Sequence, residues 1–588
     1  MVSTLTWVLA GLVAYSFVAM LLRARGVVPE YIRFTGPITT LHTQRGKEFI
    51  DWLARPKRFW RAWGNLGVGI ALVVMAGSFL LVAVGAVQAI LDPQPSALNE
   101  PRNALAIPGV NDFLPLSVAP EIILGLALGL IVHEGGHGLL CRVEDIDIKS
   151  MGLAMLAVIP IGAFVEPDEE ELLKSDRGAQ TRMYAAGVTN NFALAFVALV
   201  LLFGPVAGAI AVVDGVPVGG TLEGTPAATA GLDSGDVITA VDGVSVENAR
   251  DLEAVLAAND NETVSVARRG GETVTVDRAV VVASAVQSSQ LRNGDTITAV
   301  NGTAVTTQSQ FERAARNTTV ATLQTHGGES VTMPLGSYVL VAEDGALAAA
   351  GGPAGESMVL TALDGQRIHD SEALLSALDE TQPGDQVSVT GYVDGERRTY
   401  EVTLGSSDGS DNGILGINAL AGVSGVSVND FGIDEYPAAT FLSFIGGETD
   451  DPTADRGFSF AQRVFGVLIL PFIGVAGGFG YNFAGFTGIA TNFYTVQGPL
   501  SALGTGGVFL LANALFWTGW INVVIGQFNC VPTFPLDGGH ILRTTTESFV
   551  SRLPIPDRRR LTTAVTLTVT LSMIGGLILM VFGPRLFA

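Results

Sequence analysis

The chain has 588 residues, of which 48% are hydrophobic, and a formal net charge of −23 at pH 7. This length and apolar content exclude a single, wholly water-soluble domain, so membrane spans with an extramembrane part are expected, and two cysteines exclude a disulfide framework. The strong negative charge argues against nucleic acid as a direct partner, and an acid-rich, lysine-poor composition favours a protein adapted to high salt, as in a halophile.

Residues 1–92 are predicted to form a two-span region. Thr4 to Leu22 is a first apolar run, and Arg23 follows it rather than precedes it, which is the wrong polarity for a cleaved signal peptide. The next forty residues are rich in Arg and Lys, so by the positive-inside tendency they are cytoplasmic. The N-terminus is then expected outside, and Leu66 to Leu91 crosses outward.

The apolar run Ala119 to Leu140 contains the motif His133-Glu134-Gly135-Gly136-His137. On a helix, residues four apart share one face, so both imidazoles can bind one metal ion while Glu134 lies beside them as a base. The run is long enough to cross a bilayer, and ionisable groups inside a span are costly and usually functional. The motif therefore predicts a hydrolytic zinc centre inside the membrane, near the cytoplasmic side.

The rest of residues 93–214 completes the first part of the predicted membrane core. The apolar stretch "MGLAMLAVIPIGAFVE" is short for a span and is broken by Pro160 and Gly162. We expect a re-entrant hairpin or strand pair that lines the site, because irregular backbone at membrane depth must face protein or water. The next apolar run, Met183 to Val213, contains Asn190 and Asn191 and is expected to return outward.

Three repeats follow, with period-two alternation typical of β-strands: residues 215–281, 282–337 and a degenerate copy at 338–427. They contain "GDVITAVDG", "GDTITAVNG" and the fainter "TALDG". The stretch "GTPAATAGLDSGDVITAVDG" resembles PDZ domains of the bacterial type, which implies binding of peptide termini; a rigid spacer over the membrane site is the alternative. The span count places the repeats outside, and the glycosylation sequons at Asn261, Asn301 and Asn317 agree.

Residues 428–505 are predicted to be a linker in which Phe465 to Asn482 forms either a hairpin or further spans. Residues 506–588 form the second part of the core, where the span Gly506 to Phe528 leads into "NCVPTFPLDGGH" and Leu561 to Phe582 crosses outward. A catalytic zinc takes three protein ligands, so one is missing. Asp537 is the preferred third ligand; Cys141 and Cys530 are alternatives, although both are more often packing residues.

Two motifs together resemble the site-2 protease family of zinc intramembrane metalloproteases, in a eukaryotic or archaeal-like variant. They are H-E-x-x-H in one span and N-x-x-P-x-x-x-L-D-G in a later one, the latter formed by Asn529, Pro532, Leu536, Asp537 and Gly538. Ala186, Gly187 and Asn191 also match the A-G-x-x-x-N pattern of that family, with Val188 where the commoner bacterial form has proline. The implied fold is a polytopic α-helical membrane protein with an extracytoplasmic, β-rich insert of tandem PDZ-like domains.

The resemblance implies one Zn2+ per chain, bound by His133, His137 and Asp537, with Glu134 as the catalytic base. Asn191 and Asn529 would position the substrate backbone or stabilise the oxyanion; hydrogen bonding between helices is the alternative role for both. The implied substrates are single-pass transmembrane proteins, cut in regulated intramembrane proteolysis after another protease has shortened them outside. The implied location is the cell membrane, with the PDZ-like modules excluding full-length substrates.

Two other classes of function stay open from the residues alone. A membrane-anchored zinc protease that cuts soluble or loop substrates would share H-E-x-x-H, but it typically takes a glutamate ligand from a following helix and does not need the Asn529 to Gly538 motif. A non-catalytic membrane scaffold that presents PDZ modules would tolerate replacement of the motif residues.

Overall fold

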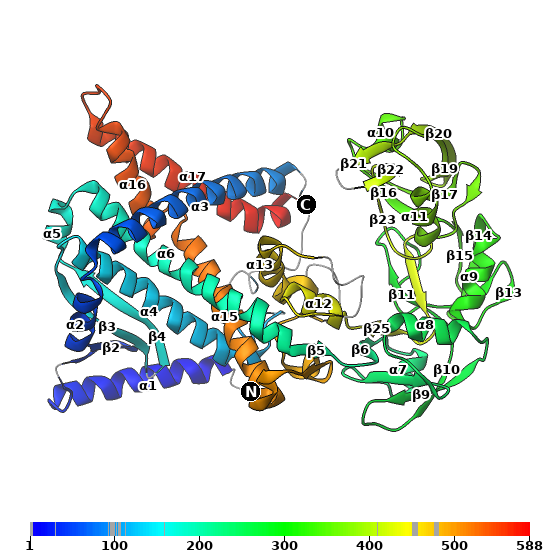
Figure 1. Cartoon of the computed structure of the whole chain (residues 1–588), viewed down its shortest axis with the longest axis horizontal. Coiled ribbons are helices and arrows are strands. Elements are labelled where there is room, and N and C mark those ends of the chain that lie inside the picture. Colours follow the sequence, from blue (N-terminus) through cyan, green and yellow to red (C-terminus); the bar gives the residue numbers. More distant parts are fainter. Residues whose placement is uncertain are drawn as a thin grey trace. The chain divides into compact units, whose positions relative to one another are not determined.

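The computed structural model describes residues 4–587 except 30, 92, 94–99, 101–102, 104–106, 112, 158, 408–409, 450–456 and 475–480. The chain divides into two compact units (Figure 1). The first, mainly helical unit contains residues 1–211, 439–488 and 495–588, and the second, mainly β unit contains residues 212–438 and 489–494.

Within the described residues, five helical stretches are long and apolar enough to cross a membrane, with mean hydropathies between 1.8 and 2.6 over 18 residues. They are Lys57–Leu91 (α3), Leu116–Val143, Arg177–Ala209, Pro499–Asn529 and Arg558–Phe587 (α17). The second stretch consists of the 3-10 turn η3 (Leu116–Val118) and α4 (Ala119–Val143), and the fourth consists of η8 (Pro499–Leu503) and α15 (Gly504–Asn529). The third consists of α6 (Arg177–Leu201), extended by η4 (Leu202–Val206) and η5 (Ala207–Ala209). Four of these stretches contain apolar runs predicted as spans, and the stretch Arg177–Ala209 contains most of a fifth, Met183 to Val213, whose end forms the strand β5 (Ile210–Val212). The first predicted span lies in α1 (Thr4–Ala24), whose described apolar part, Ala10–Ala24, is shorter.

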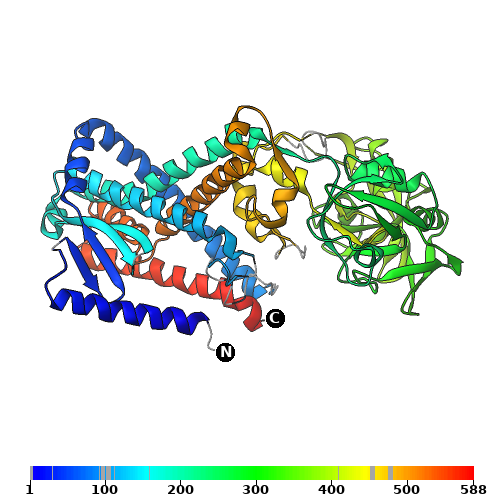
Figure 2. The ribbon, with the colours of Figure 1, turned by 90° about the horizontal axis from the view of Figure 1, so that it is seen from below.

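A four-stranded antiparallel sheet accompanies the helices, in the order β1 (Ile32–Thr35), β2 (Ile38–His42), β3 (Ile148–Leu156), β4 (Ile159–Pro167). The predicted strand pair is confirmed, because β3 and β4 pair along their whole lengths. β4 packs against α4 (Figure 2). The short helix α2 (Gln44–Leu53) follows β2 in the sequence, and α5 (Glu169–Lys174) follows β4.

Small residues let α4 pack closely against α15 and α6. A Cβ added at Gly129 would lie 2.7 Å from the Asn522 side chain on α15, and one added at Gly136 would lie 2.8 Å from the Ala186 carbonyl oxygen on α6. Asn522 also donates from Nδ2 to the Gly125 carbonyl oxygen at 3.3 Å. Close packing and interhelical hydrogen bonds of this kind hold helices together in lipid. They bring the turn of α4 that carries the two histidines against α6.

The predicted hairpin or spans between Phe465 and Asn482 lie partly outside the described residues. The described part contains α13 (Phe460–Ile469) and a 3-10 turn, η6 (Leu470–Phe472); α12 (Ala438–Phe444) lies earlier in the sequence. A ten-residue helix is about 15 Å long, half of a hydrocarbon layer of about 30 Å. α13 by itself is therefore too short to span.

The β-rich unit contains three six-stranded sheets, one for each sequence repeat (Figure 1). Each sheet packs a helix over an apolar core: α8 (Ala249–Ala257), α9 (Gln308–Arg316) and α11 (Ser371–Asp379). The first sheet contains β6 (Val216–Thr221), β7 (Val237–Val241), β8 (Val244–Ser245), β9 (Thr263–Arg268) and β10 (Val274–Asp277). The second sheet contains β11 (Val280–Ala285), β12 (Thr296–Val300), β13 (Thr303–Ala304), β14 (Val320–Thr325) and β15 (Ser330–Pro334). The third sheet contains β16 (Ser337–Val341), β17 (Ser357–Leu363), β18 (Gln366–Arg367), β19 (Gln386–Val393) and β20 (Glu396–Thr403). The shorter elements of these repeats are α7 (Pro226–Ala230), α10 (Ala346–Ala349) and the paired strands β21 (Gly405–Ser407) and β22 (Ser410–Ile414).

One short segment supplies the last strand of all three sheets, in reverse order. β23 (Ile417–Ala419) pairs with β16 of the third sheet, β24 (Val426–Asn429) with β11 of the second, and β25 (Ile433–Glu435) with β6 of the first. These return strands lie beyond the segments 215–281 and 282–337 that the repeat pattern delimits. The chain thus forms most of the three sheets in sequence order, and the following segment then adds one strand to each sheet in the reverse order.

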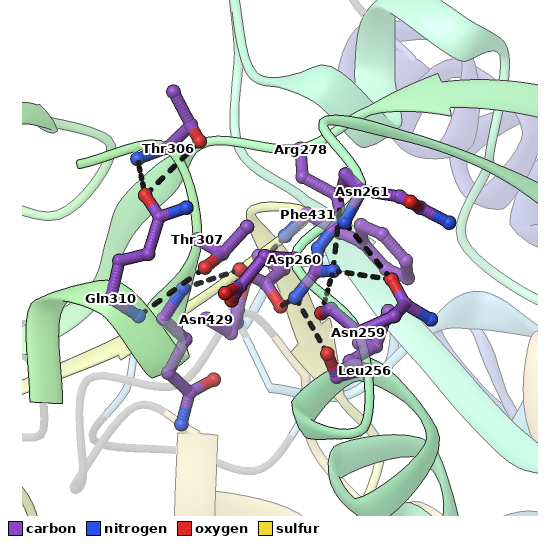
Figure 3. A network of polar contacts seen from close by, with 12 residues as sticks. Leu256, Asn259, Asp260, Asn261, Arg278, Thr306, Thr307, Gln310, Asn429 and Phe431 are labelled. Carbon is purple, nitrogen blue, oxygen red and sulfur yellow. Dashed lines mark hydrogen bonds and ion pairs between the residues drawn. The ribbon is translucent and has the colours of Figure 1, made fainter. Parts of the chain in front are cut away.

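A buried ion pair ties the return segment to the first two sheets (Figure 3). The Arg278 and Asp430 side chains are 0% and 2% exposed, and their charged atoms lie 2.6 Å apart. Arg278 also donates to the carbonyl oxygens of Leu256 and Asn259, both at 3.0 Å, while Asp430 accepts the Gln308 backbone N–H at the start of α9 at 2.6 Å. The pair therefore joins α8 of the first repeat to α9 of the second.

Candidate metal centre

The two histidines of the motif lie on one face of α4. His133 Nε2 and His137 Nε2 are 3.2 Å apart, and the His133 side chain is 8% exposed. This follows from helical geometry, since residues four apart are neighbours on one face. The helical backbone of α4 therefore places the two imidazoles side by side, as the motif predicts.

Asp537 reaches this pair from the start of α16 (Asp537–Val550). Its Oδ2 lies 3.1 Å from His133 Nε2 and 3.3 Å from His137 Nε2. Gly538 follows it, and a Cβ there would lie 2.4 Å from the Val531 carbonyl oxygen; at Gly539 it would lie 2.7 Å from the Thr533 carbonyl oxygen. Both glycines therefore allow the turn after α15 to fold back on itself and place the carboxylate beside the imidazoles.

The donor set fits a metal ion. The three donor atoms lie within 4.8 Å of one another, and Asp537 Oδ2 is buried without a hydrogen-bond donor. In the neutral form that binds a metal, the two imidazoles and the carboxylate direct lone pairs to one point, an arrangement that a bound cation stabilises. Two nitrogen ligands, one oxygen ligand and an open position match a catalytic zinc site.

Helix α6 packs against both imidazoles. The Met183 carbonyl oxygen lies 2.8 Å from His137 Nδ1, and the Asn191 amide lies 3.3 Å from His133 Nδ1. Between them, a Cβ at Gly187 would lie 2.7 Å from both His133 Cε1 and His137 Nε2. The sequence pattern singled out Gly187 and Asn191, but the Met183 contact involves the backbone and leaves no signature in the sequence.

Glu134 faces β4 of the strand pair. Its Oε2 accepts the Val165 backbone N–H at 3.0 Å. Glu134, His137 and Asp537 line one cavity of about 510 Å³, together with Val165, Glu166, Pro167, Glu169, Leu172, Leu173, Met183 and Tyr184. The motif thus opens onto a space bounded by β4, α5 and α6.

The other predicted candidates do not belong to the donor set found among the described residues. Asn529 donates to the Ile525 carbonyl oxygen of its own helix at 3.1 Å. Cys141 and Cys530 are both fully buried in apolar clusters, and the metal-binding group found among the described residues contains neither. His540, which the motif analysis did not select, stacks on Tyr184 with ring centroids 4.4 Å apart, just beyond Asp537.

Two histidines and an aspartate form a donor set among membrane-length helices, and a glutamate lies beside it. This is a membrane protein with the metal-binding arrangement of a metallopeptidase. The chain matches peptidase family M50, the site-2 protease family, over residues 121–574, and it belongs to that family. Members of this family are membrane metalloproteases and are generally zinc-dependent.

A relative of similar sequence is a protein of Methanocaldococcus jannaschii described only as uncharacterized. It is 29% identical over 174 residues, a region that covers 29% of this chain and 44% of the relative. The chain thus matches less than half of that relative's length.

Proposed function

We propose that this protein is a zinc-dependent intramembrane endopeptidase of the site-2 type, which cleaves transmembrane segments of single-pass membrane proteins in regulated intramembrane proteolysis. The observation that carries the proposal is the convergence of His133, His137 and Asp537, from two membrane-core segments far apart in the sequence, on a cavity that also exposes Glu134. Two donor histidines on the membrane-length helix α4 favour a bond cut at membrane depth.

In this mechanism the bound zinc would lower the pKa of a water molecule and polarise the scissile carbonyl. Glu134 takes the proton of the attacking water and passes it to the leaving amine. The Val165 N–H fixes one carboxylate oxygen of Glu134 and leaves the other for this proton transfer. A substrate helix must unwind locally before attack, because an intact helix keeps its peptide groups in its own hydrogen bonds.

The test compares wild-type protein with Glu134→Gln in proteoliposomes that contain a single-pass model substrate. Glutamine retains an oxygen that can accept the Val165 N–H, so zinc content should stay at one per chain while cleavage is lost. Retained cleavage would refute Glu134 as the base. Cleavage of casein but not of the transmembrane substrate would instead support a membrane-anchored protease for soluble substrates.

The ligand set has its own test in zinc content. Asp537→Ala should lose zinc, whereas Cys141→Ala should keep it, because Cys141 lies in an apolar cluster. Zinc retained by Asp537→Ala would refute the proposed donor set, whatever the effect on activity.

We also propose that the three repeats are extracytoplasmic PDZ-like modules that bind peptide termini and exclude full-length substrates. The positive-inside tendency of the loop after α1 supports this orientation, and β-sheet modules bind extended peptides by strand addition. Because both native cysteines are buried, introduced thiols report the topology. A membrane-impermeant maleimide should label Asn261→Cys in intact cells, and it should label Glu48→Cys only after permeabilisation; the reverse pattern would refute the orientation.

A further inference from the structure

Helix α6 carries two side-by-side asparagines with different surroundings. Asn190 has both ends of its amide in use: Oδ1 accepts the Trp63 indole N–H of α3 at 3.1 Å, and Nδ2 donates to the Val132 carbonyl oxygen of α4 at 3.0 Å. Asn191 is 0% exposed and lies against a metal ligand, with its amide nitrogen 3.3 Å from His133 Nδ1. Its Oδ1 is buried without a hydrogen-bond partner.

The position of His133 determines which of its nitrogens must carry the proton. His133 Nε2 faces the donor set, 3.1 Å from Asp537 Oδ2, so a metal there needs the Nε2 lone pair. In a neutral imidazole the proton then resides on Nδ1 and requires an acceptor. His137 already meets this requirement, because its Nδ1 lies 2.8 Å from the Met183 carbonyl oxygen.

Rotating the Asn191 side-chain amide by about 180° exchanges its oxygen and nitrogen and gives His133 Nδ1 a carbonyl acceptor as well. The oxygen and nitrogen of an amide are nearly the same size, and the hydrogen-bond network decides which end lies where. Turned this way, Asn191 Oδ1 accepts the Nδ1–H of His133, and the unpartnered buried oxygen gains a partner. Carbonyl and carboxylate acceptors of this kind orient metal-bound histidines and raise their basicity.

We propose that Asn191 is a positioning residue of the metal centre: its side-chain oxygen holds His133 in the tautomer and orientation that present Nε2 to the metal. Asn191 is fully buried and is not among the residues that line the cavity with Glu134, His137 and Asp537. Asn191 therefore acts through the ligand and not on the peptide. This inference rests on the proposed metal site and deepens it.

Asn190 and Asn191 offer a matched pair for the test. Asn191→Ala and Asn190→Ala delete the same atoms from adjacent positions of one helix, of which Asn191 is buried and Asn190 half-buried, but only the first removes the acceptor at His133. In detergent-solubilised full-length protein, zinc affinity measured by competition with a chromophoric chelator should fall about 10- to 100-fold for Asn191→Ala. It should stay within a few-fold of wild type for Asn190→Ala.

Two further variants separate positioning from packing. Asn191→Asp keeps an acceptor of the same shape and should restore most of the zinc affinity, together with the visible absorption spectrum of the Co2+-substituted wild-type protein. If Asn191→Ala does not fold, Asn191→Leu of similar volume takes its place and should show the loss. Equal losses for the Asn190 and Asn191 variants, or no recovery with Asn191→Asp, would overturn the inference.

The outcome is distinguishable from a failure of the proposed function. If Asp537→Ala retains zinc, the donor set itself is wrong. If Asp537→Ala loses zinc while Asn191→Ala binds it as wild type does, the donor set stands and the positioning role fails. Neither reading depends on measuring proteolysis.

Discussion

The buried pair of Arg278 and Asp430 allows a quantitative prediction about the repeats. Asp430→Ala removes the counter-charge of a guanidinium that is 0% exposed, and it removes the acceptor of the Gln308 N–H (Figure 3). Breaking a buried ion pair on one side costs about 3–5 kcal/mol, because the remaining charge stays buried without its partner. Burial also raises the pKa of Asp430 above its ordinary value, against the opposing effects of Gln308 and Arg278.

Native-state hydrogen exchange of the full-length protein in detergent measures this cost. A loss of 3–5 kcal/mol corresponds to faster exchange by a factor of roughly 10² to 10³ or more in amides that exchange through this opening. The effect should appear in both the first sheet (β6 to β10) and the second sheet (β11 to β15), because the pair joins α8 to α9. The third sheet should change less.

Two controls sharpen this prediction. Asp260→Ala breaks an exposed ion pair with Arg313, 2.8 Å apart, in the same region, and it should cost at most about 1 kcal/mol. Replacing both members of the buried pair, with Arg278→Met and Asp430→Leu, should cost less than the sum of the single changes. The reasoning is refuted if Asp430→Ala accelerates exchange less than tenfold, or if only one of the two sheets responds.

Three further predictions concern the proposed catalytic base Glu134, the contact of α6 with the imidazoles and the pH response of the β-rich unit. Glu134→Gln should lower the rate of substrate cleavage by about 10²- to 10⁴-fold at unchanged zinc content, measured in proteoliposomes. Gly187→Ala should weaken zinc binding tenfold or more, since the new Cβ would lie 2.7 Å from His137 Nε2; Gly135→Ala, where a Cβ meets nothing within 4 Å, is the control, and equal affinities would contradict the contact. Burial, with Glu253 and Asp434 nearby, raises the pKa of Glu435 from 4.5 to about 7. The folded state therefore binds the proton more tightly than the unfolded state, so the stability of the β-rich unit should fall as pH rises from about 4.5 to about 7. Glu435→Gln should flatten this dependence in hydrogen-exchange measurements, and an unchanged slope would contradict the assignment.

Local patterns in the sequence predict much of this protein. Apolar runs predict the membrane-length helices, because burial in lipid requires long uncharged helices. Helical periodicity predicts that His133 and His137 share one face, since four residues make slightly more than one full turn. The short run broken by Pro160 and Gly162 predicts the β3–β4 pair, because such a segment can neither span the bilayer nor stay helical.

The contacts that complete the sheets and the metal centre were decided only by the tertiary structure. The return strands at 417–435 are three or four residues long, and their partners lie far away in the sequence, so no local periodicity indicates which sheet each one joins. The sequence leaves Asp537, Cys141 and Cys530 as alternative third ligands, because residue type and spacing do not determine which side chain reaches the imidazoles. Packing of α4 against α6 and the tight turn before α16 bring Asp537 there and bury both thiols in apolar clusters. Patterns along the chain determine which face of a helix carries a donor, whereas the meeting of donors from different helices depends on side-chain packing between segments distant in the sequence.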